Sequence, residues 1–261
     1  MVFQWSYTEL MCLLIDIGNS RLKWAIHHNT VITPGKPIPA EPGKLDDVFT
    51  KCWSTIKPPA RVLVSNVAGY QLAETLTEWV QQNWYITTEF VQSEASAHGV
   101  FNAYTDPQKL GVDRWLGLLA VRSFTHEAAC IVDCGTAITI DILDASGHHL
   151  GGLIAPGLTT MTAALFHGTH AINEVSMTTG KIFGCNTNDA IQSGILFAAR
   201  GMIQSALQAS VTELKQNVSL FFTGGDAEKI AAEISHPHQI FPNLVLTGLA
   251  IVESGSNCVE I

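Results

Sequence analysis

Residues 13–20 read Leu-Leu-Ile-Asp-Ile-Gly-Asn-Ser, an apolar run that ends in Asp-x-Gly-Asn-Ser. Residues 129–136 read Ala-Cys-Ile-Val-Asp-Cys-Gly-Thr, a second apolar run that ends in Asp-x-Gly-Thr. Each run continues into another strand-like segment, at 22–26 and at 138–143. A short apolar run bounded by turn residues is typical of a buried strand. The repeat therefore predicts two similar halves, each with a carboxylate at the end of a buried strand beside a glycine turn.

The composition excludes some classes of protein. The chain has 261 residues, of which 47% are hydrophobic and only 14% are charged, so it can bury a sizeable core. It carries 14 Lys and Arg residues against 23 Asp and Glu residues, for a formal net charge of -9. Because nucleic-acid surfaces need clustered basic residues, this balance argues against nucleic acid as a partner. An acidic chain can still bind an anion through backbone N–H groups, a few basic side chains or a metal ion.

The cysteines and the hydrophobic segments predict a cytoplasmic protein. The six cysteines show no Cys-x-x-Cys spacing, which favours a reducing compartment. No apolar stretch reaches the roughly 18 residues that a membrane span needs, so no membrane association is expected. Residues 1–10 lack the features of a secretory signal and are expected to be a non-essential extension. His167-x-x-His170 has a metal-like spacing without a nearby third ligand, and is expected to be a loop or surface pair.

Strands and helices alternate along both halves of the chain. Strand-like runs are expected within 12–33, 61–67, 90–91, 129–134, 137–144, 148–155 and 218–222. Helices are expected at 44–56, 70–83, 115–124, 158–166, 190–214 and 244–252, and a polar loop at 93–108. This order predicts an α/β fold with two lobes, each a mixed sheet flanked by helices. The predicted division is an extension at 1–10, a first lobe at 11–124 and a second lobe at 125–261.

The two aspartate turns suit a phosphate and its metal ion. A carboxylate at the end of a buried strand is costly unless it is paired or meets a cation. Beside Asp16 and Asp133, glycine and hydroxyl residues offer donors to phosphate oxygens, while the carboxylate can hold the ion. Lys23 can add positive charge on the strand that follows the first turn. The alternative is a β-hairpin turn with a capping aspartate, which the two matched copies and a Thr-Gly-Gly-Asp turn at 223–226 disfavour.

A third acidic residue opens the helix that precedes the second repeat. Residues 111–115 read Gly-Val-Asp-Arg-Trp. An acidic residue beside an arginine at a helix start is often only a capping arrangement that the helix dipole favours. Asp113 can instead accept a proton from a hydroxyl group, and Arg114 can bind a carboxylate with two hydrogen bonds. A substrate with both a hydroxyl and a carboxylate would use both residues.

Together these segments resemble the type III pantothenate kinase family, also called the Bvg accessory factor family. The resemblance runs from about residue 13 to residue 249 as an ordered set of motifs, at 16–20, 104–115, 133–141, 151–158, 186–191 and 223–227. It implies two ribonuclease-H-like lobes of the actin-like ATPase fold, with an ATP cleft between them. It also implies ATP-dependent phosphorylation of pantothenate to 4′-phosphopantothenate, the first step of coenzyme A biosynthesis. The expected cofactors are Mg2+ and either K+ or NH4+, and the expected assembly is a homodimer whose partner chain helps to close the pantothenate pocket.

The resemblance also assigns roles to individual residues by position. Asp113 would be the general base that takes the proton from the pantothenate hydroxyl. Asp133 would hold the monovalent cation, and Asp16 would lie near the magnesium. The pantothenate pocket would comprise Tyr104, Gly111, Val112, Asp113, Arg114 and Thr187. The ATP contacts would be Asp16, Ile17, Gly18, Asn19, Ser20, Arg21, Leu22, Lys23 and Thr136.

Two alternatives stay open. One is a kinase of the same superfamily that acts on another small hydroxylated substrate, such as a sugar. The other is a non-catalytic ATP-binding accessory or regulatory protein. Retention of Asp16, Asp113, Asp133 and Thr187 argues against the second, because a scaffold has no need of all four. The chain departs from the family pattern at Ser20, where threonine is common, but the hydroxyl group is kept.

Overall fold

Each aspartate turn follows the central strand of its own sheet. The computed structural model describes residues 11–40, 45–168 and 182–255. The chain divides into a first unit, residues 1–125 with 243–261, and a second unit, residues 126–242. The central strands are β1 (Cys12–Ile17) in the first unit and β9 (Ala128–Cys134) in the second, and both are almost wholly buried. The sequence prediction of mixed sheets flanked by helices is confirmed.

The first unit is built on a mixed sheet. Its elements are β1, β2 (Arg21–His28), β3 (Val31–Pro34), β4 (Ile38–Pro39), α1 (Leu45–Trp53), β5 (Arg61–Asn66), α2 (Tyr70–Trp84) and β6 (Thr88–Phe90). The strand order is β3-β2-β1-β5-β6, with β4 paired to β2. Strand β1 is antiparallel to β2 and parallel to β5. Helix α2 makes the crossover between the parallel strands β5 and β6.

Helices α1 and α2 cover one face of this sheet. Phe49 on α1 stacks on Trp53 with 4.8 Å between the ring centroids, at the centre of a cluster of aromatic rings. The residues of β1 that join the cluster alternate along the strand: Leu13, Ile15 and Ile17. Because successive side chains of a strand point to opposite faces, Asp16 points to the other face. Helices α3 (Val112–Phe124) and α7 (Leu244–Ser254) contact the sheet there.

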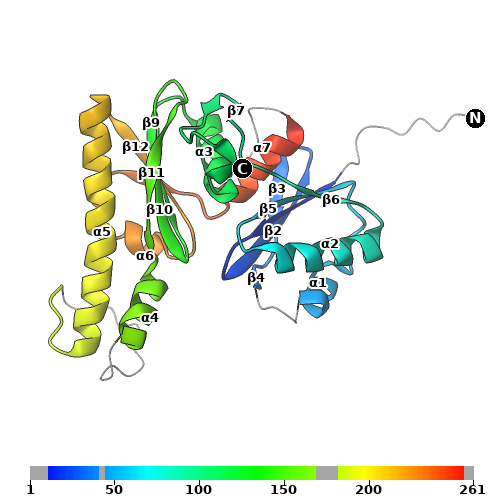
Figure 1. Ribbon diagram of the computed structural model, residues 1–261, viewed down its shortest axis with the longest axis horizontal. Coiled ribbons are helices and arrows are strands. Elements are labelled where there is room, and N and C mark those ends of the chain that lie inside the picture. Colours follow the sequence, from blue (N-terminus) through cyan, green and yellow to red (C-terminus); the bar gives the residue numbers. More distant parts are fainter. Residues whose placement is uncertain (1–10, 41–44, 169–181, 256–261) are drawn as a thin grey trace, which may run out of the picture. The chain divides into compact units, whose positions relative to one another are not determined.

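The second unit repeats this plan. Its elements are β9, β10 (Ala137–Leu143), β11 (His149–Pro156), α4 (Leu158–Gly168), α5 (Thr187–Leu214), β12 (Val218–Thr223), α6 (Ala227–Ala231) and β13 (His238–Ile240). The strand order is β11-β10-β9-β12-β13, and β9 is antiparallel to β10 and parallel to β12. Helix α5 runs along one face of this sheet (Figure 1) and buries Ile195, Ile203 and Leu207 against it.

The two sheets have the same order and the same strand directions. In each, the central strand pairs with an antiparallel hairpin partner on one side and with a parallel strand on the other. Asp16 and Asp133 are each the last residue but one of the central strand. Both point away from the face that the crossover helices cover. The duplication that two short sequence motifs suggested therefore extends to all five strands of the second sheet and to all strands of the first except β4.

The segment of the chain between β6 and α3 contains more regular structure than the sequence predicted. The expected loop at 93–108 contains a two-stranded ribbon, β7 (Ser96–Ala97) with β8 (Val100–Phe101), and a 3-10 turn, η2 (Pro107–Lys109). Strands of two residues carry too little pattern to be detected from the sequence. Helix α5 begins at Thr187 rather than Ala190, because Asn186 caps it.

The C-terminal helix belongs to a different unit from the one that the sequence predicted. The sequence prediction assigned 125–261 to the second lobe, whereas residues 243–261 belong to the first unit. Helix α7 packs on α3, where a Cβ atom at Gly248 would overlap the backbone of Leu116. This glycine permits the close approach of the two helices. Helical periodicity shows that a helix has an apolar face, but it does not show which sheet that face covers.

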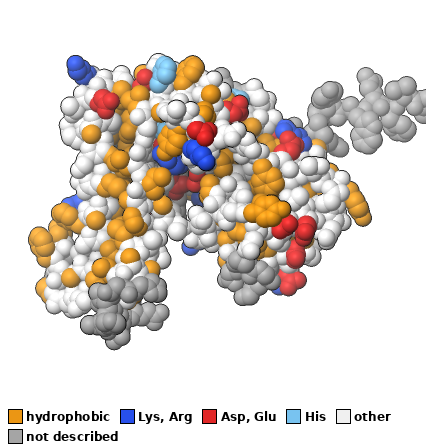
Figure 2. All heavy atoms as spheres, viewed as in Figure 1, with side chains coloured by type: hydrophobic (Ala, Val, Ile, Leu, Met, Phe, Trp, Pro, Cys, Tyr) orange, Lys and Arg blue, Asp and Glu red, His pale blue; other side chains and the backbone are white. Residues whose placement is uncertain are grey.

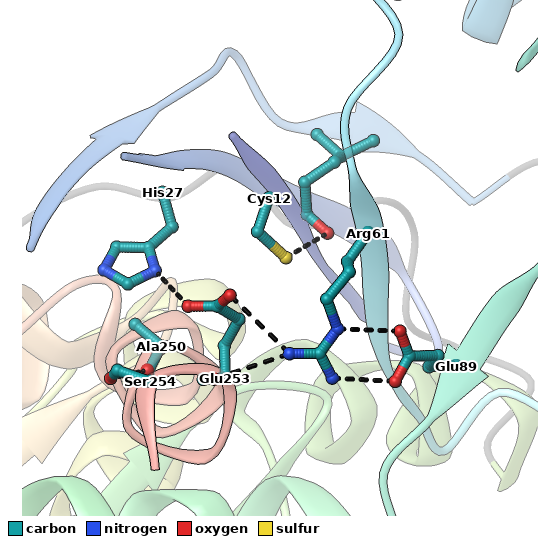
Figure 3. Close-up of polar contacts among 8 residues, drawn as sticks. Cys12, His27, Arg61, Glu89, Ala250, Glu253 and Ser254 are labelled. Atoms are coloured by element: carbon teal, nitrogen blue, oxygen red, sulfur yellow. Dashed lines mark hydrogen bonds and ion pairs between the residues drawn. The ribbon is translucent and has the colours of Figure 1, made fainter. Parts of the chain in front are cut away.

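Ion pairs join α7 to the first sheet (Figure 3). Arg61 on β5 donates two hydrogen bonds to Glu89 on β6, with Nε–Oε1 at 2.9 Å and Nη2–Oε2 at 2.7 Å. Its Nη1 lies 3.6 Å from Oε1 of Glu253 on α7, whose Oε2 lies 3.0 Å from Nδ1 of the buried His27. Burial, with the Glu253 carboxylate nearby, raises the pKa of Cys12 to about 12, so that thiol stays protonated. The network ties the C-terminal helix to three strands of the sheet, β2, β5 and β6.

Some sequence predictions lie outside what the structure describes. They concern residues 1–10, His170 and the side chain of His167. In the described ranges, the five cysteines are free, and burial raises the pKa of Cys130 to about 12. No helix in these ranges is long and apolar enough to cross a membrane.

Candidate functional site

Asp16 is a buried carboxylate at the end of β1. Its side chain is 9% exposed, and its Oδ1 accepts a hydrogen bond of 3.0 Å from the hydroxyl of Ser65 on β5. Strand register places Lys23 on β2 opposite Asp16 on the other side. The carboxylate thus lies between a hydroxyl and an ammonium group on one face of the sheet, which lowers the cost of burying it. The sequence predicted Lys23 here but missed Ser65, whose only signal is a hydroxyl near the end of the apolar run 61–67.

The first turn is tight. The N–H of Gly18 donates to the carbonyl of Arg21 at 3.0 Å, and a Cβ atom at Gly18 would lie 3.1 Å from that oxygen. Asn19, Ser20 and Arg21 are exposed at the turn. Ile17 and Leu22 pair across it and are buried, so these two can meet a ligand only through their backbone. The turn can therefore present polar side chains and backbone N–H groups to an anion.

Asp133 occupies the corresponding place in the second unit. Register sets Thr139 of β10 on one side of it and Thr223 of β12 on the other. Gly224 follows β12 with φ at +95°, and a Cβ atom there would overlap Oδ1 of Asp133. Glycine is needed at 224 both for this backbone conformation and for the space that the carboxylate occupies. The sequence singled out the 223–226 turn but did not predict its contact with Asp133.

Gly157 packs against the second turn, at Gly135 and Thr136. The N–H of Gly157 donates to the carbonyl of Thr136 at 2.9 Å, and a Cβ atom at Gly157 would overlap the backbone of Gly135. The hydroxyl of Thr160 donates to the same Thr136 carbonyl at 2.7 Å. Thr136 itself is exposed at the turn. The carbonyl oxygen of Thr136 thus accepts two hydrogen bonds that fix the turn, while the exposed side chain remains accessible to a ligand.

Asp113 lies in the first turn of α3. Its Oδ1 accepts a hydrogen bond of 2.8 Å from the N–H of Arg114. A Cβ atom at Gly111 would lie 2.7 Å from the same Oδ1, so glycine at this position makes room for the carboxylate. A helix N-terminus stabilises a negative charge. Asp113 is half-buried, so its carboxyl group remains within reach of a ligand.

Arg114, which follows Asp113 in the chain, contacts Tyr104. Arg114 is 8% exposed, and its Nη1 donates to the Tyr104 hydroxyl at 2.9 Å. The guanidinium also lies 5.8 Å from the centroid of the Tyr104 ring. Val112, between Gly111 and Asp113 in the chain, is buried. The structure thus brings together Tyr104, Gly111, Asp113 and Arg114 around the start of α3.

The loop that carries Tyr104 is fixed by two residues that the sequence did not reveal. The side-chain amide of Asn102 donates to the carbonyls of Glu94 and Pro107 at 3.1 and 3.2 Å, and its Oδ1 accepts from the N–H of Tyr104. The buried Ser93 hydroxyl donates to the carbonyl of Leu110 at 2.9 Å. Hydrogen bonds from a side chain to a distant backbone carbonyl leave no periodic signal in a sequence.

Thr187 is exposed in the first turn of α5. Asn186 caps this helix: its Oδ1 accepts from the N–H of Asp189 at 2.9 Å, and its Nδ2 also donates to Oδ2 of Asp189 at 2.9 Å. Thr187 belongs to the second unit, whereas the other residues predicted for pantothenate belong to the first.

The donor atoms indicate what kind of cation suits the two turns. Asp16 and Asp133 offer carboxylate oxygens with hydroxyl groups beside them, and hard cations such as Mg2+ and K+ prefer oxygen ligands. Within the described ranges, no three His, Cys, Asp or Glu side chains group together as a metal cluster. A cation at either turn would therefore take further oxygens from a phosphate or from water.

Comparison with known proteins identifies the family. The family profile described as type III pantothenate kinase matches residues 12–209. The type III pantothenate kinase of Nitrosococcus oceani is 40% identical over 96% of each chain, and that of Nitrosomonas eutropha is 36% identical over 94% of this chain and 95% of the relative.

Solved structures agree on the fold. A Campylobacter jejuni protein described as a conserved putative Baf family transcriptional activator has a TM-score of 0.59 and 25% identity, over 93% of this chain and 98% of its own. MreB 5 of Spiroplasma citri, bound to AMPPNP, has a TM-score of 0.52 and 10% identity, over 94% and 96%, which shows an actin-like fold. On the family profile and these relatives, the chain belongs to the type III pantothenate kinase family.

Proposed function

We propose that this chain transfers the γ-phosphoryl group of ATP to the hydroxyl of pantothenate, with Asp113 as the general base. The family acts on pantothenate in coenzyme A biosynthesis, and the chain is a kinase of that family. The observation that carries the assignment of the base is the carboxylate at the start of α3, which has a helix N–H on Oδ1 and a glycine beside it. A general base must be ionised and within reach of the proton that it takes.

The proposed reaction conserves atoms and charge. Asp113 takes the hydroxyl proton of pantothenate while the hydroxyl oxygen attacks the γ-phosphorus. The bond from the γ-phosphorus to the β,γ-bridging oxygen breaks, ADP leaves, and Asp113 later releases its proton to solvent. Since phosphoryl transfer has a loose transition state, the protein contributes mainly position and charge. Arg114, which Tyr104 orients, suits the pantothenate carboxylate because a guanidinium binds a carboxylate with two parallel hydrogen bonds.

The phosphates of ATP are proposed to lie at the two turns. The segment from Asp16 to Lys23 and Thr136 would contact them, and Thr187 would contact pantothenate. Asp16 would hold Mg2+, and Asp133 would hold K+ or NH4+, because each offers the oxygen donors that such ions take. When bound, these ions neutralise charge on the triphosphate.

A small cavity in the second unit suits the nucleoside part of ATP. It has a volume of about 200 Å3 and lies between α4, α5 and α6. Its walls are apolar at Leu158 and Ile195, with Gln192 and Asp226 as polar groups. Leu158 follows Gly157 under the Thr136 turn, and the N–H of Asp226 donates to the carbonyl of Cys134 at 2.9 Å. The cavity is therefore contiguous with the proposed phosphate turn.

A homodimer is proposed to form through the outer face of α5. Gly194 and Gly201 lie in the interior of this helix, and a Cβ atom at either would meet nothing within 4 Å. A glycine inside a helix costs about 1 kcal/mol relative to alanine, and no described residue is close enough to require one here. Residues seven apart lie on one side of a helix, so a second copy could approach closely along it. Phe197 on α5 and Ile154 on β11 are 51% and 65% exposed, and Figure 2 shows hydrophobic side chains on this unit.

A phosphorylation assay tests the function. Purified full chain with ATP, Mg2+ and K+ should release ADP in proportion to pantothenate and should be inactive with a panel of sugars. Phosphorylation of a sugar but not of pantothenate would favour the superfamily-kinase alternative. Binding of ATP without phosphorylation of either would favour the accessory protein. The same proposal places the reaction in the cytoplasm, where ATP is available and free cysteines persist.

A further inference from the structure

A groove in the first unit lies outside the proposed active site. It has a volume of about 680 Å3 and lies between α2 and β6. None of the residues predicted to contact ATP, pantothenate or a cation lines it. Two aromatic side chains on its walls, Tyr70 and Phe90, are 76% and 39% exposed. An exposed aromatic pair in a concave surface is typical of a binding site rather than of a random surface.

One wall of the groove is an open sheet edge. Strand β6 is the last in the order β3-β2-β1-β5-β6, so in the described part of the chain it pairs on one side only. The N–H of Val91 donates inward to the carbonyl of Val64 at 2.9 Å. Because the residues of an edge strand alternate in which side they bond, the N–H and C=O of Phe90 face the open side. Such an edge can accept an added strand.

The other wall is negatively charged. Glu74 and Glu78 lie one helical turn apart on the exposed side of α2, and both line the groove. Tyr70 donates a hydrogen bond of 3.3 Å to Glu74, but neither carboxylate forms an ion pair within the described ranges. Helix α2 contains no lysine or arginine. Like charges at this spacing repel each other, so a cation between them would stabilise the helix. Figure 2 shows acidic side chains next to hydrophobic ones on this unit.

We propose that this groove binds an extended, lysine- or arginine-rich segment of another protein, which adds a strand to β6. Four residues of a helix advance about 6 Å, and two residues of a strand advance about 6.6 Å. Alternate basic side chains of an extended peptide would therefore meet Glu74 and Glu78 in turn. Their aliphatic stems, or an arginine guanidinium, would cover Tyr70 and Phe90. The peptide backbone would pair with Phe90. The proposal does not depend on the proposed function, because the two share no residue.

Peptide binding to the full chain tests this proposal. The probe is a short fluorescein-labelled peptide of alternating lysine and valine, followed by fluorescence anisotropy. Saturable binding is expected, and a peptide of alternating glutamate and valine should not bind. Replacing both groove carboxylates, Glu74→Gln with Glu78→Gln, should weaken binding about tenfold, since each exposed ion pair contributes a few-fold. The matched control, Glu94→Gln with Glu213→Gln, removes two exposed charges elsewhere and should change affinity less than about twofold.

One further variant and one further peptide separate strand addition from general charge attraction. Phe90→Pro removes an N–H group at the sheet edge and should weaken binding, while pantothenate phosphorylation stays unchanged and shows that the protein is folded. A peptide with its lysines and valines in two separate blocks should bind more weakly than the alternating peptide. Equal binding of the two peptides, or equal weakening by both pairs of charge variants, would overturn the proposal. So would binding that requires removal of residues 1–10, because the groove would then serve the chain's own segment.

Discussion

Gly224 provides the space that the Asp133 carboxylate occupies. A Cβ atom at residue 224 would overlap Oδ1 of Asp133, although Asp133 lies on β9 and Gly224 directly follows a different strand, β12. Asp133 is therefore positioned by a turn that lies about ninety residues away in the chain. This contact links two of the motifs that the sequence shows separately.

Gly224→Ala should displace Asp133 and reduce activity. Alanine at φ +95° is strained by about 1–2 kcal/mol, and its Cβ also meets the carboxylate. Gly69→Ala is the matched control, because Gly69 has φ +94° and nothing within 4 Å of its Cβ position. Both variants should lose thermal stability, but only Gly224→Ala should lose activation by K+. Normal K+ activation in Gly224→Ala would show that the contact does not position the cation ligand.

Asp113→Asn should reduce turnover far more than ATP binding. General bases contribute about 10²- to 10⁴-fold to rate, so kcat should fall within this range. Asparagine keeps the oxygen that accepts from the Arg114 N–H, so α3 should begin as before. Asp106→Asn, at an exposed position in the loop before α3, is the control and should leave kcat within about twofold. Steady-state kinetics with calorimetric titration of ATP measure both quantities, and a full-rate Asp113→Asn enzyme would remove the base assignment.

The sequence predicted the parts of this protein that depend on local pattern. Both aspartate turns, the two sheets and most helices follow from apolar runs and turn residues, and the structure confirms them. Asp113 was singled out because an acidic residue opens a helix, which is again a local signal. Ser65 was not predicted because it acts on Asp16, 49 residues away in the chain, and Asn102 was not predicted because its hydrogen bonds to backbone carbonyls leave no periodic signal. Gly157 belongs to the motif at 151–158, but the sequence did not predict its contact with the Thr136 turn.

The placement of α7 also depends on contacts that local sequence patterns do not reveal. Its apolar sequence predicts a buried helix, and the structure buries it against α3 and the first sheet. The partners that select this place are Gly248, which admits α3, and Glu253, which reaches Arg61 and His27. None of these contacts produces a periodic pattern in the sequence. The sequence prediction therefore grouped α7 with the neighbouring segments of the second unit rather than with the first.

Exchange of K+ for Na+ should remove most of the activity. Asp133 offers a carboxylate beside two threonines in register, and K+ at this place would offset its repulsion of the triphosphate. Calorimetry should show weaker ATP binding in Na+ than in K+. Asp133→Asn should make the two salts equivalent in both assays. An enzyme that is indifferent to the exchange would remove Asp133 from the cation role.

The Arg61–Glu89 pair should contribute to stability only above acidic pH. The two hydrogen bonds from Arg61 lower the pKa of Glu89 in the folded protein. A lowered carboxylate pKa gives stability that is present above the unfolded pKa and is lost as pH falls through the folded pKa. Both side chains are partly exposed, so the contribution at neutral pH is below about 1 kcal/mol. Glu89→Gln should therefore lower Tm at pH 7, and the difference should shrink as pH falls below the ordinary glutamate pKa of about 4.3. Glu94→Gln, an exposed acidic residue outside the ion-pair network, should show no such pH dependence.

Gly201→Arg should separate the proposed homodimer into single chains. An arginine on the outer face of α5 would fill the space that the partner helix is proposed to occupy. Light scattering during gel filtration should give twice the 28.2 kDa chain mass for the wild type and the chain mass for the variant. Glu213→Arg is the control, because it places an arginine on the same helix about 120° away from Gly201 and should stay dimeric.

The same variant tests the role proposed for the partner chain. If a second copy closes the pantothenate pocket, Gly201→Arg should raise KM for pantothenate far more than the Kd for ATP. Loss of both affinities together would indicate that the variant damages the second unit itself. A wild-type protein that elutes as a single chain, with full activity, would exclude the homodimer as a requirement for catalysis.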